Sequence, residues 1–193
     1  MQIQTIKNSI YNSATYIIYD DVLKYAFLID CGDSDKILKF INEKGLVIKG
    51  IFITHCHYDH IYGLNAIYEN NKDITIYASE ETIKGLYDNK INLSLYMETP
   101  YICNKAIKTE IVTEDNCINT YNLNIYVINT LGHDAGCTTY IINNCIFTGD
   151  SYIPGTKVFS KTKRGDKELA NQSIKKIIDL IDRNNYKLYP GHI

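Results

Sequence analysis

The chain has 193 residues, of which 45% are hydrophobic and 22% charged, and its formal net charge is -2. This composition predicts one globular domain over residues 1–193 and gives no reason to expect nucleic acid or an anionic membrane as a partner. The N-terminus has no signal-peptide pattern and no apolar run is long enough to cross a bilayer, so we expect a cytoplasmic protein, monomer or homodimer, with reduced cysteines.

The first half of the chain alternates short runs of β-branched and aromatic residues with turns and helices. Asp33 or Ser34 can cap a helix that Gly45 ends, and Ser79 can open a helix that runs through Leu86. A short helix is predicted at 62–68, whereas 88–105 is expected to be a loop with some helix, over the functional site or beside it. Strands are predicted at 3–6, 15–19, 24–29, 48–54 and 74–78.

The second half returns to strands and closes with a long amphipathic helix over 166–183, in which Ala170, Ile174 and Ile177 share one face. Asn143-Asn144 predicts a tight hairpin. Both halves therefore run from strands to helices, which indicates an α/β fold with layered sheets inside and helices outside. Strands are predicted at 105–111, 118–121, 125–129, 138–142, 145–148 and 187–189.

A dense group of potential metal ligands, His55-Cys56-His57-Tyr58-Asp59-His60, follows the apolar run 48–54. In an extended segment alternate side chains point the same way, so His55 and His57 can converge on one metal ion. Asp59 and His60 follow and can turn toward a second ion nearby. Imidazole nitrogens and carboxylate oxygens are ligands that suit zinc, iron or manganese.

Three further potential ligands each follow a glycine at the end of a predicted strand. These are His133 after Gly132, Asp150 after Gly149, and His192 after Gly191. A glycine lets the backbone turn sharply and approach a site closely, and strand ends commonly carry functional loops. With these residues, one site accounts for every histidine in the chain.

The combination of HxHxDH, Gly-His, Gly-Asp and Pro-Gly-His, in that order, resembles the metallo-β-lactamase superfamily. The segments 130–138 and 147–151 look most like those of the small glyoxalase II-type hydrolases. The resemblance implies a four-layer αββα sandwich with two divalent metal ions, zinc before iron or manganese. It also implies a ligand set in which His55, His57 and His133 hold one ion, Asp59, His60 and His192 hold the other, and Asp150 bridges them.

The resemblance further implies hydrolysis of a small-molecule thioester or related acyl substrate by a metal-bound hydroxide that Asp59 orients and deprotonates. The alternative is a mononuclear iron persulfide dioxygenase, which would need only His55, His57, His133 and Asp150. A lactonase is less favoured. A binding module with a vestigial site is disfavoured because no ligand is missing. Antibiotic hydrolysis is disfavoured as a main activity because the best-known zinc β-lactamases carry cysteine where Asp150 stands.

Residues around the ligands suggest supporting roles. Asp30 and Thr54 are candidate partners for the second nitrogen of ligand imidazoles, although Asp30 can equally be a turn acid. Beyond the bridging position, Tyr152 could donate to an oxyanion, and Lys161 and Arg164 could hold a substrate carboxylate. The alternatives are packing for Tyr152 and a solvated loop for the two basic residues.

Two expectations concern features at the edge of the site. Cys56 and Cys137 are expected to be close enough to the metals for oxidation, without being ligands. Glyoxalase II adds a C-terminal helical domain, whereas only one residue follows His192 here. We therefore expect the metal to hold His192 in place and the metal-free protein to have a disordered C-terminus.

Overall fold

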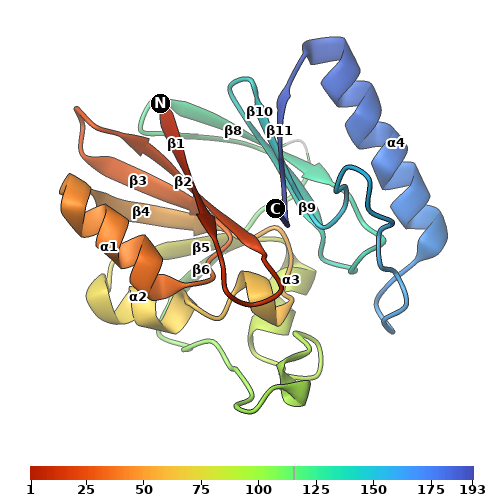
Figure 1. Cartoon of the computed structure of the whole chain (residues 1–193), viewed down its shortest axis with the longest axis horizontal. Coiled ribbons are helices and arrows are strands. Elements are labelled where there is room, and N and C mark those ends of the chain that lie inside the picture. The colour runs from red at the N-terminus through yellow and green to blue at the C-terminus, as the bar shows by residue number, and fades with distance from the viewer. Residues whose placement is uncertain (115) are drawn as a thin grey trace.

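Two β-sheets face each other at the centre of the computed structural model, which describes residues 1–114 and 116–193 (Figure 1). The first sheet has the order β1-β2-β3-β4-β5-β6, and the second has the order β11-β10-β9-β8-β7. The first consists of β1 (Gln2–Lys7), β2 (Ala14–Asp20), β3 (Tyr25–Ile29), β4 (Val47–Phe52), β5 (Thr75–Ala78) and β6 (Lys108–Ile111). The second consists of β7 (Cys117–Thr120), β8 (Leu123–Asn129), β9 (Thr138–Ile142), β10 (Cys145–Gly149) and β11 (Lys187–Pro190).

Both sheets are mixed. Strands β1 to β3 pair antiparallel and β3 to β6 pair parallel, while in the second sheet only the β10–β11 pair is parallel. Helices α1 (Ser34–Lys44), α2 (Leu64–Asn70) and α3 (Glu80–Leu86) lie on the side of the first sheet, and α4 (Lys167–Asn184) covers the second (Figure 1). The arrangement is the predicted αββα sandwich.

Three layers of apolar side chains hold the sandwich together. The layer between the sheets is rich in buried aromatic rings, including Phe27, Phe52, Tyr140 and Phe147. A second layer joins the first sheet to α1 and α2, and a third joins the second sheet to α4 through Ile177. Burial of one such side chain contributes roughly 1.5–3 kcal/mol, so these layers fix how the two sheets face each other.

The predicted elements are observed, with shifted ends where side chains compete for backbone groups. Strand β4 ends at Phe52 rather than at residue 54, because the backbone N–H of Thr54 donates to the carboxylate of Asp30 at 2.8 Å. Strand β6 begins at Lys108 because Asn104 forms a turn with the residues just before it. Helix α2 begins at Leu64, two residues later than predicted.

The helix ends follow the expected capping residues. Gly45 adopts the left-handed conformation, with φ of 62°, at the end of α1. Ser79 accepts a hydrogen bond from the backbone N–H of Thr82 at the start of α3. The N-cap residue of α1 is Asp33, but its side chain accepts no hydrogen bond from the backbone of the helix. Within the described residues, the structure contains no helix that is both long and apolar enough to traverse a bilayer.

Candidate metal centre

The predicted ligands lie on loops that leave four strands. After β4 the chain remains extended to His57 and then turns through a short 3-10 helix, Tyr58–His60, which redirects Asp59 and His60. The other three ligands follow the ends of β8, β10 and β11. Strand ends of both sheets therefore meet at one site, as the positions of the glycines predict.

The structure brings all seven predicted residues together. The ligand atoms of His55, His57 and His133, here called the first triad, lie within 4.8 Å of one another. The same holds for Asp59, His60 and His192, the second triad. One oxygen of Asp150 lies 3.4 Å from His60 Nε2 and the other lies 3.5 Å from His133 Nε2, so this carboxylate lies between the triads.

Several polar atoms at the centre of this group are buried without a hydrogen-bond partner. They are His55 Nε2, His57 Nε2, His60 Nε2 and Asp150 Oδ1. A buried polar atom left unpaired costs about 1–3 kcal/mol, and such atoms are rare in folded proteins. The ligand atoms of His55, His60 and Asp150 lie within 4.8 Å of one another, and His57 places its Nδ1 2.8 Å from His133 Nε2, so the residues fit divalent ions.

A buried hydrogen-bond network orients two of the imidazoles. Asp30 Oδ2 bonds Nδ1 of His60 at 2.9 Å and also accepts from the hydroxyl of Thr54 at 2.8 Å. The Thr54 hydroxyl in turn lies 3.1 Å from Nδ1 of His55. The Nδ1 atoms are thereby occupied, which leaves each Nε2 directed at the centre. The predicted supporting roles of Asp30 and Thr54 are confirmed.

Backbone carbonyls orient two other imidazoles. Nδ1 of His133 donates to the carbonyl of Phe159 at 2.6 Å, and Nδ1 of His192 lies 2.9 Å from the carbonyl of Tyr11. Sequence reasoning missed both partners, because a carbonyl is common to every residue and leaves no pattern to find. Segments 8–13 and 153–165 therefore belong to the site.

Charge is distributed unevenly over the site. Burial and the neighbouring imidazoles lower the pKa of His55 well below its usual value. Burial also lowers the pKa of His60, but the carboxylates of Asp59, Asp150 and Asp30 outweigh it and raise that pKa well above normal. For Asp59 and Asp150, burial raises the pKa, but the neighbouring imidazoles outweigh burial and lower the pKa below its usual value. Both side chains therefore remain carboxylates at neutral pH. The carboxylates of Asp59 and Asp150 thus provide negative charge where a cation would bind.

Two of the glycines are required by close contacts. A Cβ on Gly191 would lie 2.1 Å from Oδ1 of Asp150, and a Cβ on Gly132 would lie 2.1 Å from the backbone nitrogen of Ala170. Gly132 also has a φ of 125°, a conformation that other residues rarely adopt. These positions let strand ends approach the site more closely than any larger residue would allow.

The structure corrects the expectation that metal alone holds His192. Ser13 forms a β-bridge with His192, and the backbone N–H of Ala14 donates to the carbonyl of Gly191 at 2.7 Å. The backbone N–H of Ile193 also donates to Asn12. Segment 8–13 therefore holds this strand end through backbone bonds in addition to any metal, and disorder of the C-terminus in the metal-free protein stays a prediction.

Two of the three proposed substrate-binding residues have other partners. Arg164 donates to the buried carboxylate of Asp134 through Nε at 2.8 Å and to Glu81 at 3.0 Å. It therefore connects segment 153–165 to the loop that carries His133, rather than offering a free cation. Tyr152 packs against the apolar layer under α4, so its observed role is packing. Lys161 does line a cavity beside the site.

The cysteines near the ligands are shielded. Cys56 and Cys137 are both fully buried, and burial raises the pKa of each thiol. Oxidation requires an accessible thiolate, so the expected sensitivity of these two residues does not fit their environment. Neither cysteine belongs to a group of potential metal ligands in the described part of the chain.

Three cavities border the ligands, and one of them, of about 310 Å³, lies between His133, Asp150 and His192 and segment 153–159. A second cavity, of about 370 Å³, lies over the ligands and is lined by metal-binding residues together with Tyr11, Tyr58 and Met97. The third, of about 910 Å³, extends from His57 between segments 88–96 and 159–164. The predicted placement of 88–105 beside the site is thus confirmed.

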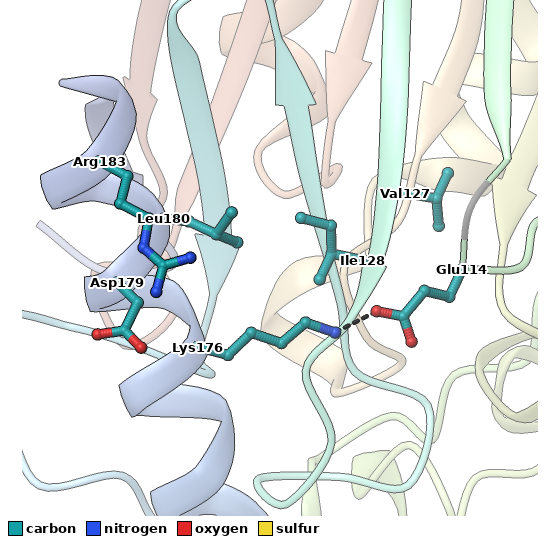
Figure 2. Close-up of a pocket in the computed structure, with 7 residues that line it drawn as sticks. All are labelled: Glu114, Val127, Ile128, Lys176, Asp179, Leu180 and Arg183. Atoms are coloured by element: carbon teal, nitrogen blue, oxygen red, sulfur yellow. Dashed lines mark hydrogen bonds and ion pairs between the residues drawn. The ribbon is translucent and has the colours of Figure 1, made fainter.

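A separate cavity of about 310 Å³ lies between α4 and β8, away from the ligands (Figure 2). An ion pair between Lys176 and Glu114 crosses it, over an apolar floor. It has no part in the metal centre. Its lining residues are Glu114, Val127, Ile128, Lys176, Asp179, Leu180 and Arg183.

Comparisons with known proteins agree with this geometry. The profile described as "Metallo-beta-lactamase superfamily" matches residues 11–192. The hydroxyacylglutathione hydrolase of Buchnera aphidicola subsp. Baizongia pistaciae is 31% identical over 136 residues, which are 68% of this chain and 45% of that protein. The chain thus spans less than half the length of this curated relative.

Solved structures share the fold at low sequence identity. BLEG-1, a B3 metallo-β-lactamase, superposes with a TM-score of 0.89 at 24% identity, covering 100% of this chain and 92% of that one. TTHA1623 in a di-iron-bound form gives a TM-score of 0.77 at 18% identity, covering 98% and 92%. At these identities the likeness concerns the fold alone.

Proposed function

Because the chain belongs to the metallo-β-lactamase superfamily, we propose that it is a metal-dependent hydrolase of a thioester or related small acyl substrate. The observation that carries this proposal is the complete set of seven ligands, with unpaired buried atoms of His55, His60 and Asp150 at its centre. The name of the Buchnera relative, a hydroxyacylglutathione hydrolase, supports the same class of substrate. The protein would act on a small molecule in the cytoplasm.

The first triad would hold one ion and the second triad another, and Asp150 would contribute to both sites. The ligands are nitrogen and oxygen atoms, which suit zinc, and also iron or manganese. When bound, two such ions lower the pKa of a shared water and polarise a carbonyl oxygen. The remaining requirements, orientation and proton transfer, fall to the side chains of this chain.

Asp59 is the proposed proton acceptor. Its backbone carbonyl accepts a hydrogen bond from the hydroxyl of Ser13 at 2.7 Å, which fixes the turn that carries it. Its carboxylate lies 3.3 Å from His60 Nε2 and 3.4 Å from His192 Nε2. Because its pKa is lowered, the carboxylate is ionised at neutral pH and is available to orient a water and take its proton.

The alternative is oxygen-dependent chemistry at a single iron held by the first triad and Asp150. The second triad favours hydrolysis, because a buried carboxylate orients His60, just as hydrogen-bond partners orient imidazoles of the first triad. A mononuclear enzyme would not need this network. The di-iron form of TTHA1623 is evidence that a protein of this fold binds two irons, so iron by itself does not decide between the two reactions.

Metal analysis of protein purified without added metal, followed by reactions with zinc- and iron-loaded samples, tests the proposal. We expect close to two ions per chain and hydrolysis of thioesters without oxygen uptake. The substrates are a panel of thioesters, lactones and a persulfide. One iron per chain, together with oxygen uptake on the persulfide and no thioester hydrolysis, would replace our proposal with the dioxygenase.

A further inference from the structure

The large cavity beside the metal centre has room for more than an acyl group. It shares His57, Leu93, Tyr96 and Phe159 with the cavity over the ligands, so the two spaces are adjacent. Its volume of about 910 Å³ is at the upper end of small-molecule sites, which are roughly 300–1,000 Å³. A substrate with its scissile bond at the ligands could therefore extend a sizeable group into this space.

Large apolar side chains are exposed to solvent on the walls of the large cavity. Tyr96 is 82% exposed, Phe159 is 55% exposed and Leu95 is 43% exposed. They come from segments 88–96 and 159–164, which face each other across the cavity. Apolar side chains gathered in one exposed place commonly mark a binding surface. Here they lie next to the reacting centre, so the apolar group they would cover belongs to the substrate.

The same cavity carries an excess of positive charge. Lys90, Lys161 and Lys163 line it, and none of them forms an ion pair with a described residue. Its fourth cation, Arg164, is paired with Asp134. The other carboxylate, Asp88, accepts hydrogen bonds from the backbone of 90–91. Three lysines without ion pairs thus line the cavity, together with one carboxylate that is already hydrogen-bonded. This excess of positive charge favours an anionic ligand group.

We propose that the substrate joins an apolar group and an anion, a carboxylate or phosphate, to the scissile acyl bond. The apolar group lies on Leu95, Tyr96 and Phe159, and the anion is held by Lys161 and Lys163. This inference rests on the proposed hydrolysis and adds the substrate class to it. The anion can be on the leaving thiol or on the acyl part, and the experiment separates these two sources.

Four acetyl thioesters test the proposal on the zinc-loaded protein. Their thiols are 4-(mercaptomethyl)benzoate, benzyl mercaptan, 3-mercaptopropionate and 2-mercaptoethanol, which vary the apolar group and the anion independently. We expect kcat/KM to rise about tenfold with the apolar group and about fivefold with the anion. Added salt should reduce only the second gain. A parallel series places the same groups on the acyl side, and the series with the larger gains identifies the source.

Variants connect the preferences to the cavity. Tyr96→Ala should reduce the ratio of kcat/KM for thioesters of the benzyl thiols over thioesters of the small thiols. The double variant Lys161→Ala, Lys163→Ala should reduce the ratio of kcat/KM for thioesters of the anionic thiols over thioesters of the neutral thiols. Tyr126→Ala, at a half-exposed tyrosine on β8, and Lys39→Ala, on α1, are the matched controls and should leave both ratios unchanged. Circular dichroism and metal content verify that each variant is folded and loaded.

The outcomes separate this inference from the proposed function. Hydrolysis of all thioesters at equal rates would overturn the substrate class and leave the hydrolase proposal standing. Preferences that survive the cavity variants would overturn the assignment of this cavity. Loss of the proposed function itself would appear as no hydrolysis in either series with zinc, iron or manganese.

Discussion

The two triads of the metal centre are supported in different ways, because Asp30 contacts His60 directly but reaches His55 only through the hydroxyl of Thr54. The first triad is almost fully buried, yet its supports are neutral: the hydroxyl of Thr54 for His55 and the carbonyl of Phe159 for His133. The second contains a carboxylate ligand, and a further buried carboxylate, Asp30, supports His60. The second triad thus depends on buried carboxylates, whereas the first depends on the position of segment 153–165.

Asp150→Ala removes the residue between the triads and should have the largest effect. We expect metal binding and activity to fall together by more than about a hundredfold, because loss of a direct ligand exceeds the 10–100-fold cost of losing a supporting partner. Metal analysis and thioester hydrolysis measure the two effects, and Asp73→Ala, at an exposed acid, is the control. Retained activity in a folded protein would disprove the bridging assignment.

Asp30→Asn tests the charged support of the second triad. The amide keeps the size of the side chain but removes its charge, so we expect the affinity for the ion at the second triad to fall by about 10–100-fold. The affinity for the other ion should fall less, because Asp30 reaches His55 only through the hydroxyl of Thr54. Competition with a chelator resolves the two binding steps. If both steps weakened equally, or neither did, the triads would not differ in the way described here.

Arg164→Gln tests the neutral support of the first triad. It breaks the bonds to Asp134 and Glu81 that hold segment 153–165, so the carbonyl of Phe159 should lose its position beside His133. We expect about a tenfold loss of affinity for one ion, with the Asp30-dependent step unchanged. Arg183→Gln, at an arginine on α4, is the matched control. Unchanged affinity in Arg164→Gln would mean that segment 153–165 holds its place without this ion pair.

The smallest predicted effect concerns Asp33, which accepts two bonds from Ser9 in the segment that holds His192. Burial raises the pKa of Asp33, but bonds from Lys36, Tyr62 and Ser9 outweigh it and lower the pKa from 3.8 to about 2. A lowered carboxylate pKa stabilises the fold above pH 3.8, and this contribution disappears as the pH falls through 2.

Urea unfolding of the metal-free protein at several pH values measures this contribution. We expect Asp33→Asn to lower the free energy of unfolding by about 1 kcal/mol at pH 5, with the difference from the unsubstituted protein vanishing toward pH 2. A difference that stayed constant with pH would show that the effect of the substitution is steric rather than ionic.

The parts of the molecule that the sequence predicts are those that depend on local pattern. Alternating apolar runs gave the strands, and glycines before His133, Asp150 and His192 gave the strand ends at which the ligands meet. The supporting role of Asp30 was predictable because an acid directly after a buried strand is uncommon without a polar partner. These features depend on residue type at a known spacing.

The parts that escaped prediction depend on contacts between distant segments. The carbonyls of Tyr11 and Phe159 have no sequence signature, although each orients a ligand. Arg164 was expected to hold a substrate carboxylate because it is basic, and its pairing with Asp134 and Glu81, both far from it in sequence, leaves no local pattern. Tyr152 is close to Asp150 in sequence, but the chain directs its ring into the layer under α4.

The bond between Tyr11 and His192 joins positions that are 181 residues apart. During synthesis the cluster at 55–60 emerges long before His192, so its imidazoles exist for a time without the second triad. Contacts of such sequence separation form late and slowly. The full set of ligands for two ions therefore exists only after His192 has been synthesised, and a nascent chain that acquires metal earlier does so with an incomplete set of ligands.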